Sequence, residues 1–272
     1  MMYSYRQHMA YLAELHCGHH GHLFALVDAG QSAKLADRLL GASAFVKVAQ
    51  VFEGTFASAA MDCSPLLMQL PDLPSDRLTS INLLDEICCA LPILGFLDGS
   101  LSMESLLFHL RGLLQLHVDE TPYLWRFADT QMLQATAAVL SDAQRQRVFG
   151  VMRGWYTLDH QQVLRNQAAS PVNDAVQAPM GNATATLILS AAQESALLEQ
   201  VAGPNLASQL RALEPSFIRA LTHAQQTAFA QACLIEAREL AVNLDSELLD
   251  WTRERWRATC RVNDTTLLDS SS

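Results

Sequence analysis

Lysine is almost missing from this chain. Only Lys34 and Lys47 are lysines among the 272 residues, and the other positive charges are arginines. Aspartate and glutamate outnumber lysine and arginine by 28 to 18, so the formal net charge is −10. Because phosphate binding needs a basic face, this balance argues against a nucleic-acid partner. Arginine, in contrast, favours bidentate and partly buried pairing with carboxylates.

Catalytic motifs are also missing. The chain contains no GxSxG, no P-loop, no GxGxxG and no HExxH. One alternative interpretation is a small α/β hydrolase or transferase that uses Asp28 and a nearby histidine. Asp28 follows the apolar run Leu23–Val27, and α/β enzymes place catalytic groups at the carboxyl ends of strands. The other interpretation is a carboxylate bonded to neighbouring loop amides. We favour the second, because no nucleophile or base motif accompanies Asp28.

No compact set of cysteines indicates a disulfide framework. The six cysteines are scattered along the chain, and neighbours such as Cys88 and Cys89 do not normally bridge each other. Free thiols in a reducing cytoplasm are therefore expected.

Paired metal-ligand spacings are missing too, although five potential ligands crowd one short segment. Glycines between them indicate a mobile loop, and a structural zinc site normally needs ligands from a second segment. We therefore expect no functional metal and no cofactor, with a metal-binding protein as an alternative that the sequence leaves open. The five residues are His16, Cys17, His19, His20 and His22.

No apolar run is long enough to cross a bilayer. The longest run, residues 87–97, is short for a transmembrane helix and contains Pro92. The N-terminus lacks the charged-then-apolar pattern of a signal peptide. We expect a cytoplasmic protein with no membrane partner.

The chain does contain short apolar runs that alternate with helical patterns. Half of its residues are hydrophobic, which is enough for a sizeable core. Strands that alternate with helices, together with one hairpin, predict a mixed α/β (α+β) fold with helices packed on a mixed sheet. The expected strands cover residues 23–27, 46–52, 65–70, 93–97, 114–118 and 123–128.

A stretch at residues 166–183 is low in large apolar groups and contains three Pro or Gly residues, which predicts a linker. Residues 1–165 before it form the expected mixed α/β lobe. Residues 184–262 after it have helical patterns, including the capping boxes Ser190/Gln193 and Thr222/Gln225, and predict an all-helical lobe. The polar tail 263–272 is expected to be disordered.

The run 106–129 combines a helix end, a hairpin and two arginines. Arg126 is expected in the middle of the second hairpin strand, with Asp129 three residues on. Because an arginine among apolar strand residues is rarely buried without a partner, we predict an ion pair for Arg126 or for Arg111, with Asp129 or Asp28 as the acid.

Beyond Asp129 the pattern becomes helical up to Gly154-Trp155-Tyr156, where Trp155 is expected to be a core or lid aromatic. The last helix carries aromatic and arginine side chains of the types that dominate interface energetics. An equally weighted interpretation makes its tryptophans core residues and its arginines solvated. The residues concerned are Trp251, Arg253, Trp256 and Arg257.

Six segments between Leu23 and Trp155 carry a resemblance to a known family. They read LFALVDAG, VFEGT (which includes Glu53), SPLLMQL, SLLFHLRGLLQLHV, LWRFADTQML and QRQRVFGVMRGWY. In their order they resemble the effector adaptors, or chaperones, of bacterial type VI secretion systems, commonly called Tap or Tec proteins. Arg126, Phe127 and Asp129 match that family's arginine–aromatic–x–aspartate strand end, and Arg111 matches its helix arginine.

The chain also departs from the family pattern. Ala128 stands where an aromatic is expected and Thr130 where a proline is expected, which weakens the exact role of the Arg126 strand. The histidine-rich segment is not a feature of the family. The resemblance implies a non-enzymatic cytoplasmic protein that binds one toxic effector and loads it onto the VgrG spike. It also implies a common α/β scaffold, with client choice in the less similar helical lobe.

Overall fold

The computed structural model describes residues 5–15, 21–31, 33–88, 91, 93–118, 120–158, 163–168, 186–240, 242 and 245–269. Its chain divides into two compact units, residues 1–197 and 198–272, here called the first and second unit. The mixed α/β fold predicted from the sequence is confirmed. The division falls further along the chain than the predicted linker 166–183, whose residues 169–185 lie outside the described residues.

The first unit is built on a six-stranded sheet in which every described pair of neighbours is antiparallel. The central strand is the apolar run that ends at Asp28, and its register places Phe24 opposite both Gln69 and Leu97. In spatial order the strands are β2 (Lys47–Gln50), β3 (Leu66–Gln69), β1 (His22–Val27), β4 (Leu94–Gly99), β7 (Gly154–Leu158) and β8 (Leu164–Asn166).

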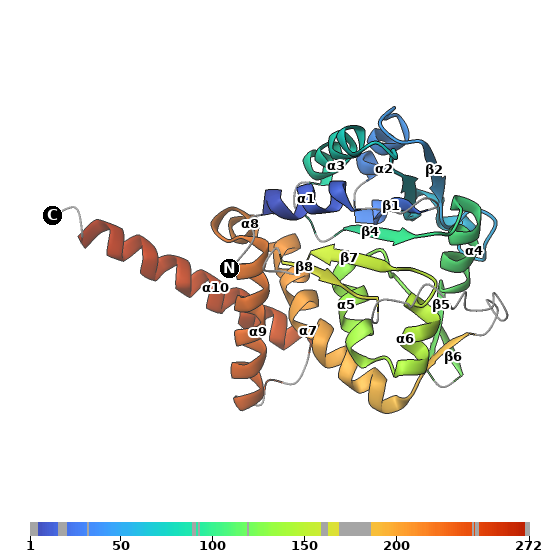
Figure 1. The fold of residues 1–272 in the computed structure, drawn as a ribbon. Helices are drawn as coiled ribbons and strands as arrows, with labels where there is room; N and C mark the ends of the chain where they lie inside the picture. The colour runs from blue at the N-terminus through green and yellow to red at the C-terminus, as the bar shows by residue number, and fades with distance from the viewer. Residues whose placement is uncertain are drawn as a thin grey trace. The chain divides into compact units, whose positions relative to one another are not determined.

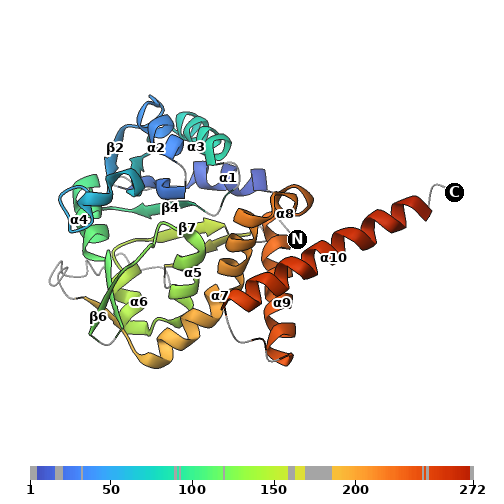
Figure 2. The same cartoon turned by 180° about the vertical axis from the view of Figure 1, so that it is seen from behind.

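Helices cover both faces of this sheet (Figures 1 and 2). Because side chains alternate along a strand, Leu23, Ala25 and Val27 point to one face, where they share a core with the first three helices. Phe24 and Leu26 point to the other face. The helices are α1 (Tyr5–Glu14), α2 (Ala33–Leu40) and α3 (Pro74–Cys88) on the first face, and α4 (Met103–Gly112), α5 (Thr130–Val139) and α6 (Asp142–Phe149) on the second.

A second, three-stranded sheet has the order β6-β5-β9. The predicted hairpin forms its first two strands, β5 (Gln115–Val118) and β6 (Thr121–Leu124), which pair antiparallel. The third strand, β9 (Leu187–Leu189), pairs parallel with β5. The sequence predicted a main sheet with both parallel and antiparallel pairs. Among the described strands, such mixed pairing occurs only in this small sheet.

Three strands were not predicted from the sequence. The pattern after Asp129 predicts helices as far as Gly154-Trp155-Tyr156, but residues 154–158 form β7. Residues 164–166, for which the sequence predicts no element, form β8. Residues 187–189 were assigned to the helical lobe, but they form β9 in the first unit. Strands of three to five residues give too few side-chain alternations to be separated from one helical turn.

Both predicted capping boxes are present. Ser190 and Gln193 bond reciprocally, as do Thr222 and Gln225 at the start of α9. Gln193 Nε2 also donates to Gln144 Oε1 over 2.7 Å, and Gln144 belongs to the capping box of α6. The first turn of α7 is thereby fixed to the first turn of α6.

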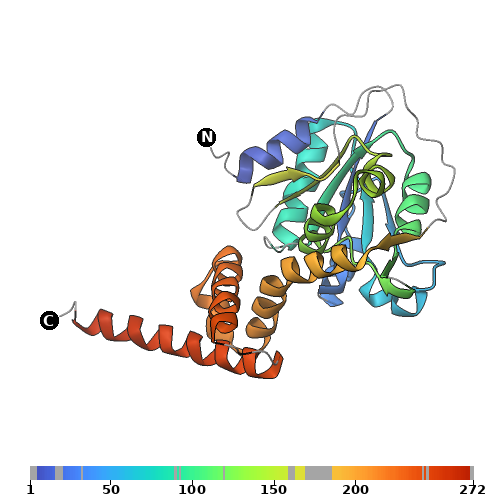
Figure 3. The ribbon, with the colours of Figure 1, turned by 90° about the horizontal axis from the view of Figure 1, so that it is seen from below.

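The second unit is helical. Leu206 and Ala207 of α7 pack against Ala230 and Cys233 of α9 in one of its cores, and Figure 3 shows α10 running past α9 as one long helix. Its helices are α7 (Ala191–Leu213), which begins in the first unit, α8 (Pro215–Ala220), α9 (His223–Glu239) and α10 (Asp245–Asp269), which covers most of the predicted tail 263–272.

Candidate functional site

The acid at the end of β1 is bound to an arginine. Arg126 Nη2 lies 2.8 Å from Asp28 Oδ2, and the two residues are 98 positions apart in the sequence. The Asp28 side chain is only 6% exposed, whereas that of Arg126 is 51% exposed. The ion pair predicted for Arg126 is therefore present, and about half of the Arg126 side chain remains exposed.

The sequence predicted Arg126 in the middle of a strand, but it lies after the end of one. β6 ends at Leu124, and the last hairpin hydrogen bond runs from Trp125 N to Leu114 O over 2.8 Å. A turn follows, closed by the bond from Asp129 N to Arg126 O. The turn is stabilised by burial of Trp125 and Phe127 in the core, which points Arg126 outward towards Asp28.

Asp129 forms the N-cap of α5. Its Oδ1 accepts hydrogen bonds from the backbone amides of Gln131 and Met132, which would otherwise be unpaired at the helix start. Its Oδ2 lies 3.9 Å from Arg126 Nη2, a longer contact than that of Asp28. Asp129 thus has mainly a structural part, and Arg126 lies between two acids.

The electrostatics of the three groups follow from burial and from their mutual distances. Burial raises the pKa of Asp129, and the amide of Met132 and the charge of Arg126 only partly oppose it. Burial lowers the pKa of Arg126, but the charge of Asp28 and its hydrogen bond outweigh that effect, so the pKa of Arg126 is raised. Arg126 therefore keeps its positive charge beside Asp28, at the surface of the first unit.

Removing this arginine should cost stability. Because Asp28 is buried and Arg126 is half exposed, we expect Arg126→Ala to lower the free energy of unfolding by about 2 kcal/mol, between the values for exposed and buried pairs. A double-mutant cycle of Arg126→Ala with Asp28→Asn, measured by urea unfolding, should give a coupling of about 1–2 kcal/mol. The matched control is Asp129→Asn, which keeps a capping side chain and should couple to Arg126 by less than about 1 kcal/mol. Equal coupling of Arg126 to both acids would contradict this assignment.

Arg111 has partners that the sequence did not indicate. Its Nε donates to Val51 O over 3.1 Å and its Nη2 to Gln50 O over 3.3 Å. Val51 N bonds to Pro65 O, but Pro65 has no N–H to return to Val51 O, so Arg111 supplies the missing donor. Glu53, 72% exposed, lies 3.9 Å away. Asp28 and Asp129, the acids predicted for Arg111, are paired with Arg126 instead.

Trp155 lies in the core, fully buried in β7. Its ring makes edge-to-face contacts with Phe127 and Phe149, at centroid distances of 6.0 and 5.7 Å. Trp125 extends the series and donates from Nε1 to Thr136 Oγ1. This aromatic cluster holds α5, α6 and the Arg126 turn against the sheet.

The residues predicted on the last helix lie in the second unit. Arg253 Nε and Arg257 Nη2 both bind Glu214 Oε1, at 3.2 and 2.6 Å. Trp256 is 4% exposed and belongs to a core cluster, while Trp251 packs at the side of another. Two arginines and Trp256 therefore have partners within the unit, and their role in binding stays a prediction.

Two further ionic residues were missed from the sequence. Arg77 of α3 is 5% exposed and donates four hydrogen bonds to backbone carbonyls. Asp98 at the end of β4 is 5% exposed and lies 2.7 Å from Arg153 Nη2. An acid directly after an apolar run was the signal available for Asp98, as it was for Asp28.

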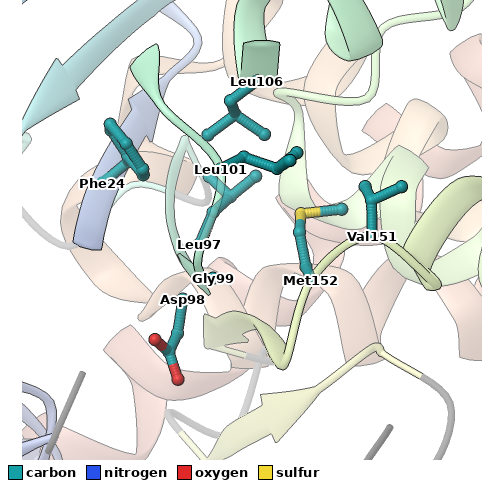
Figure 4. A pocket seen from close by; sticks show the side chains of 8 residues that line it. All are labelled: Phe24, Leu97, Asp98, Gly99, Leu101, Leu106, Val151 and Met152. Carbon is teal, nitrogen blue, oxygen red and sulfur yellow. The ribbon is translucent and has the colours of Figure 1, made fainter. Parts of the chain in front are cut away.

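A small pocket beside β4 is apolar (Figure 4). It has no room for even a water molecule, whereas ordinary ligand sites have volumes of roughly 300–1,000 Å³. The Asp98 carboxylate points away from the apolar side chains in Figure 4. This pocket therefore offers no polar group to orient a substrate. Its lining residues are Phe24, Leu97, Asp98, Gly99, Leu101, Leu106, Val151 and Met152.

The predicted histidine and cysteine cluster is mostly outside the described residues. Only His22 is described; it begins β1, with Nδ1 3.4 Å from Gln69 Nε2. Within the described ranges, no three His, Cys, Asp or Glu side chains lie close enough to hold a metal ion. The metal interpretation of residues 16–22 stays a prediction.

Comparison with known proteins gives one finding. Residues 23–147 match the family model described as a domain of unknown function (DUF4123). This segment runs from β1 into α6, so it contains the Asp28–Arg126–Asp129 cluster and Arg111 but not the second unit. No curated protein and no solved structure matches the chain. In the part of the chain that the structure describes, no helix combines the length and apolarity needed to cross a membrane.

Proposed function

We propose that this protein is a non-enzymatic cytoplasmic adaptor that binds a toxic effector and loads it onto the VgrG spike of a bacterial type VI secretion system. The observation that carries the proposal is the family match over residues 23–147. That family is linked to type VI effector adaptors. The matched segment holds the arginine–aromatic–x–aspartate motif and Arg111, on which the resemblance read from the sequence also depends.

The geometry of the motif supports a scaffold better than a catalyst. Asp28, the acid considered for catalysis, is bound to Arg126, and one oxygen of Asp129 is used to cap α5. The apolar pocket beside β4 is small, and its nearby acid is paired with Arg153. An adaptor needs a stable scaffold with exposed contact surfaces, and the pair leaves half of Arg126 exposed for such contacts.

The two units suggest a division of labour. The matched first unit supplies the common scaffold. The second unit, outside the matched segment, supplies client choice. It exposes apolar side chains such as Ile235 at 53% and Leu240 at 60%. Apolar surface of this kind is used by adaptors to contact clients.

The test is co-purification of the full chain with the effector encoded beside its gene and with the C-terminal region of the neighbouring spike protein. We expect both to bind. Ile235→Asp on α9 should weaken effector binding at least about tenfold. Phe56→Asp makes the same kind of change at an exposed apolar residue of the first unit and should leave effector binding unchanged. Binding of neither protein by the wild-type chain would end the adaptor proposal. If Phe56→Asp weakened effector binding and Ile235→Asp did not, only the assignment of client choice to the second unit would be wrong.

A further inference from the structure

We propose that an extended segment of the effector adds to the open edge of β6 as a fourth strand of the three-stranded sheet. This inference rests on the proposed function, because it names how the effector is held. The three-stranded sheet has the order β6-β5-β9, so β6 is an edge strand. Figures 1 and 2 show it at the margin of the first unit. All four of its residues are exposed, with Tyr123 at 49% and Leu124 at 43%.

The hairpin register shows which backbone groups of β6 face away from β5. Gln115 lies opposite Leu124, and the bond from Trp125 N to Leu114 O marks the adjacent pair as hydrogen-bonded. Hydrogen-bonded and non-hydrogen-bonded pairs alternate in an antiparallel ladder. Tyr123 and Thr121 are therefore bonded to β5, whereas Leu124 and Pro122 direct their backbone groups outward.

The outward groups are three: the N–H and C=O of Leu124 and the C=O of Pro122. Within the described residues, no hydrogen bond to these groups is found outside the hairpin. Pro122 costs the hairpin nothing, because its position needs no N–H there. It does restrict the edge, since an added strand must present a donor, not an acceptor, opposite Pro122.

The β2 edge of the main sheet is covered by polar side chains, in contrast to the edge of β6. At β2 the side chain of Arg111 donates to Gln50 O, which faces away from β3. Lys47 at the other end of β2 pairs with Glu104 of α4 over 3.1 Å. Natural proteins cover or charge such edges to prevent unwanted strand pairing. In the described part of the chain, the four residues of β6 are all exposed and none of them is charged; two of them are the apolar Tyr123 and Leu124.

The side chains around the edge define the occupant. Cross-strand partners share a face, so Leu124 and Pro122 lie on the same face as His117 and Ile188, and Ile188 is 57% exposed. Tyr123 lies on the opposite face. A strand with apolar side chains at consecutive positions would cover Leu124 on one face and Tyr123 on the other, because successive side chains of a strand point to opposite faces.

A second copy of this chain fits the edge less well. If two β6 strands paired antiparallel about a two-fold axis, either Leu124 would face its own copy or Leu124 would face Pro122, which has no N–H. Each arrangement forms at most two hydrogen bonds between strand residues. A different strand can satisfy all three outward groups, which favours the effector over self-association.

Hydrogen exchange on the full chain tests the proposal without any mutation. Leu124 carries the only outward amide among the four residues of β6, since Pro122 has none. In complex with the effector encoded beside the gene, exchange at the Leu124 amide should slow by at least about tenfold, while the Tyr123 and Thr121 amides serve as internal references. The spike C-terminal region should leave the Leu124 amide unchanged.

Two variants of one residue give a second measurement. Leu124→Pro removes the outward N–H, and Leu124→Ile keeps both the N–H and an apolar side chain. We expect Leu124→Pro to weaken effector binding at least about tenfold and Leu124→Ile to change it less than about threefold. Should Leu124→Pro not fold, hydrogen exchange in the wild-type complex decides.

Tight effector binding with an unprotected Leu124 amide would overturn the inference and leave the adaptor function standing. Protection by the spike region, or in a dimer without effector, would overturn the choice of occupant, and binding of neither protein would remove both proposals.

Discussion

Replacing Trp256 by alanine should lower the free energy of unfolding of the second unit by about 3–5 kcal/mol, the usual cost of deleting a buried aromatic side chain. Trp256 is 4% exposed, and its ring centroid lies 5.0 Å from that of Phe217 and 5.6 Å from that of Phe229. Its Nε1 also donates to Ser216 Oγ over 3.1 Å. The side chain therefore joins α8, α9 and α10, and its loss leaves a cavity at their junction.

The measurement is urea unfolding followed by a probe of helix content, because the second unit is helical. The matched control is Trp251→Ala on the same helix, one turn and a half before Trp256 and only partly buried, which should cost less than about 2 kcal/mol. This comparison separates packing from binding. A Trp256→Ala chain that unfolds like the wild type but loses the effector would show that Trp256 is an interface residue after all.

The sequence could not choose between those two roles for Trp256. Helical spacing shows that Trp256 and Cys260 share a face with Leu249, but any long helix has one face that packs. Which face packs depends on α8 and α9, which lie elsewhere in the chain. The partners of Arg253 and Arg257 could not be predicted either. Both bind Glu214, which directly precedes α8 and is distant from them in the sequence.

Long apolar runs and caps, in contrast, were predictable. The segments that became β1, β3 and β4 are apolar on both faces because helices cover both sides of the sheet. The predicted capping boxes Ser190/Gln193 and Thr222/Gln225 are both present. Both features depend on neighbouring residues only, so one segment of sequence is sufficient to find them.

The candidate site was predicted in part, for a physical reason. An arginine among apolar residues needs an acid, and an acid after a strand is held in place, so Arg126 and Asp28 could be named as partners. The turn that brings them together could not, because it depends on burial of Trp125 and Phe127 under a distant aromatic cluster. The partner of Arg111 could not be predicted at all. Arg111 binds Val51 O, which lacks a backbone donor only because strand pairing places it opposite Pro65.

Replacing Arg77 is the second change with a large expected effect. Its guanidinium donates to Ala13 O and Leu15 O at the end of α1, at 3.1 and 2.9 Å. It donates also to Pro71 O and Asp72 O in the loop before α3, at 3.0 and 2.7 Å. Five N–H groups in one planar fork can reach carbonyls on both sides, which an ammonium cannot.

Arg77→Met keeps the apolar stem and removes every donor, so carbonyls at the end of α1 lose their partner. We expect a loss of about 3 kcal/mol in the free energy of unfolding, because each buried acceptor left unpaired costs about 1–3 kcal/mol and some will be hydrated again. Arg77→Lys should recover about half of that loss, since it keeps the charge and can donate to one side. Urea unfolding measures the total, and hydrogen exchange of the α1 amides shows where the loss falls. If Arg77→Met loosened α1 no more than Arg77→Lys did, the four hydrogen bonds would not be what holds this helix, and packing of Met9 and Leu12 against α3 would have to carry it alone.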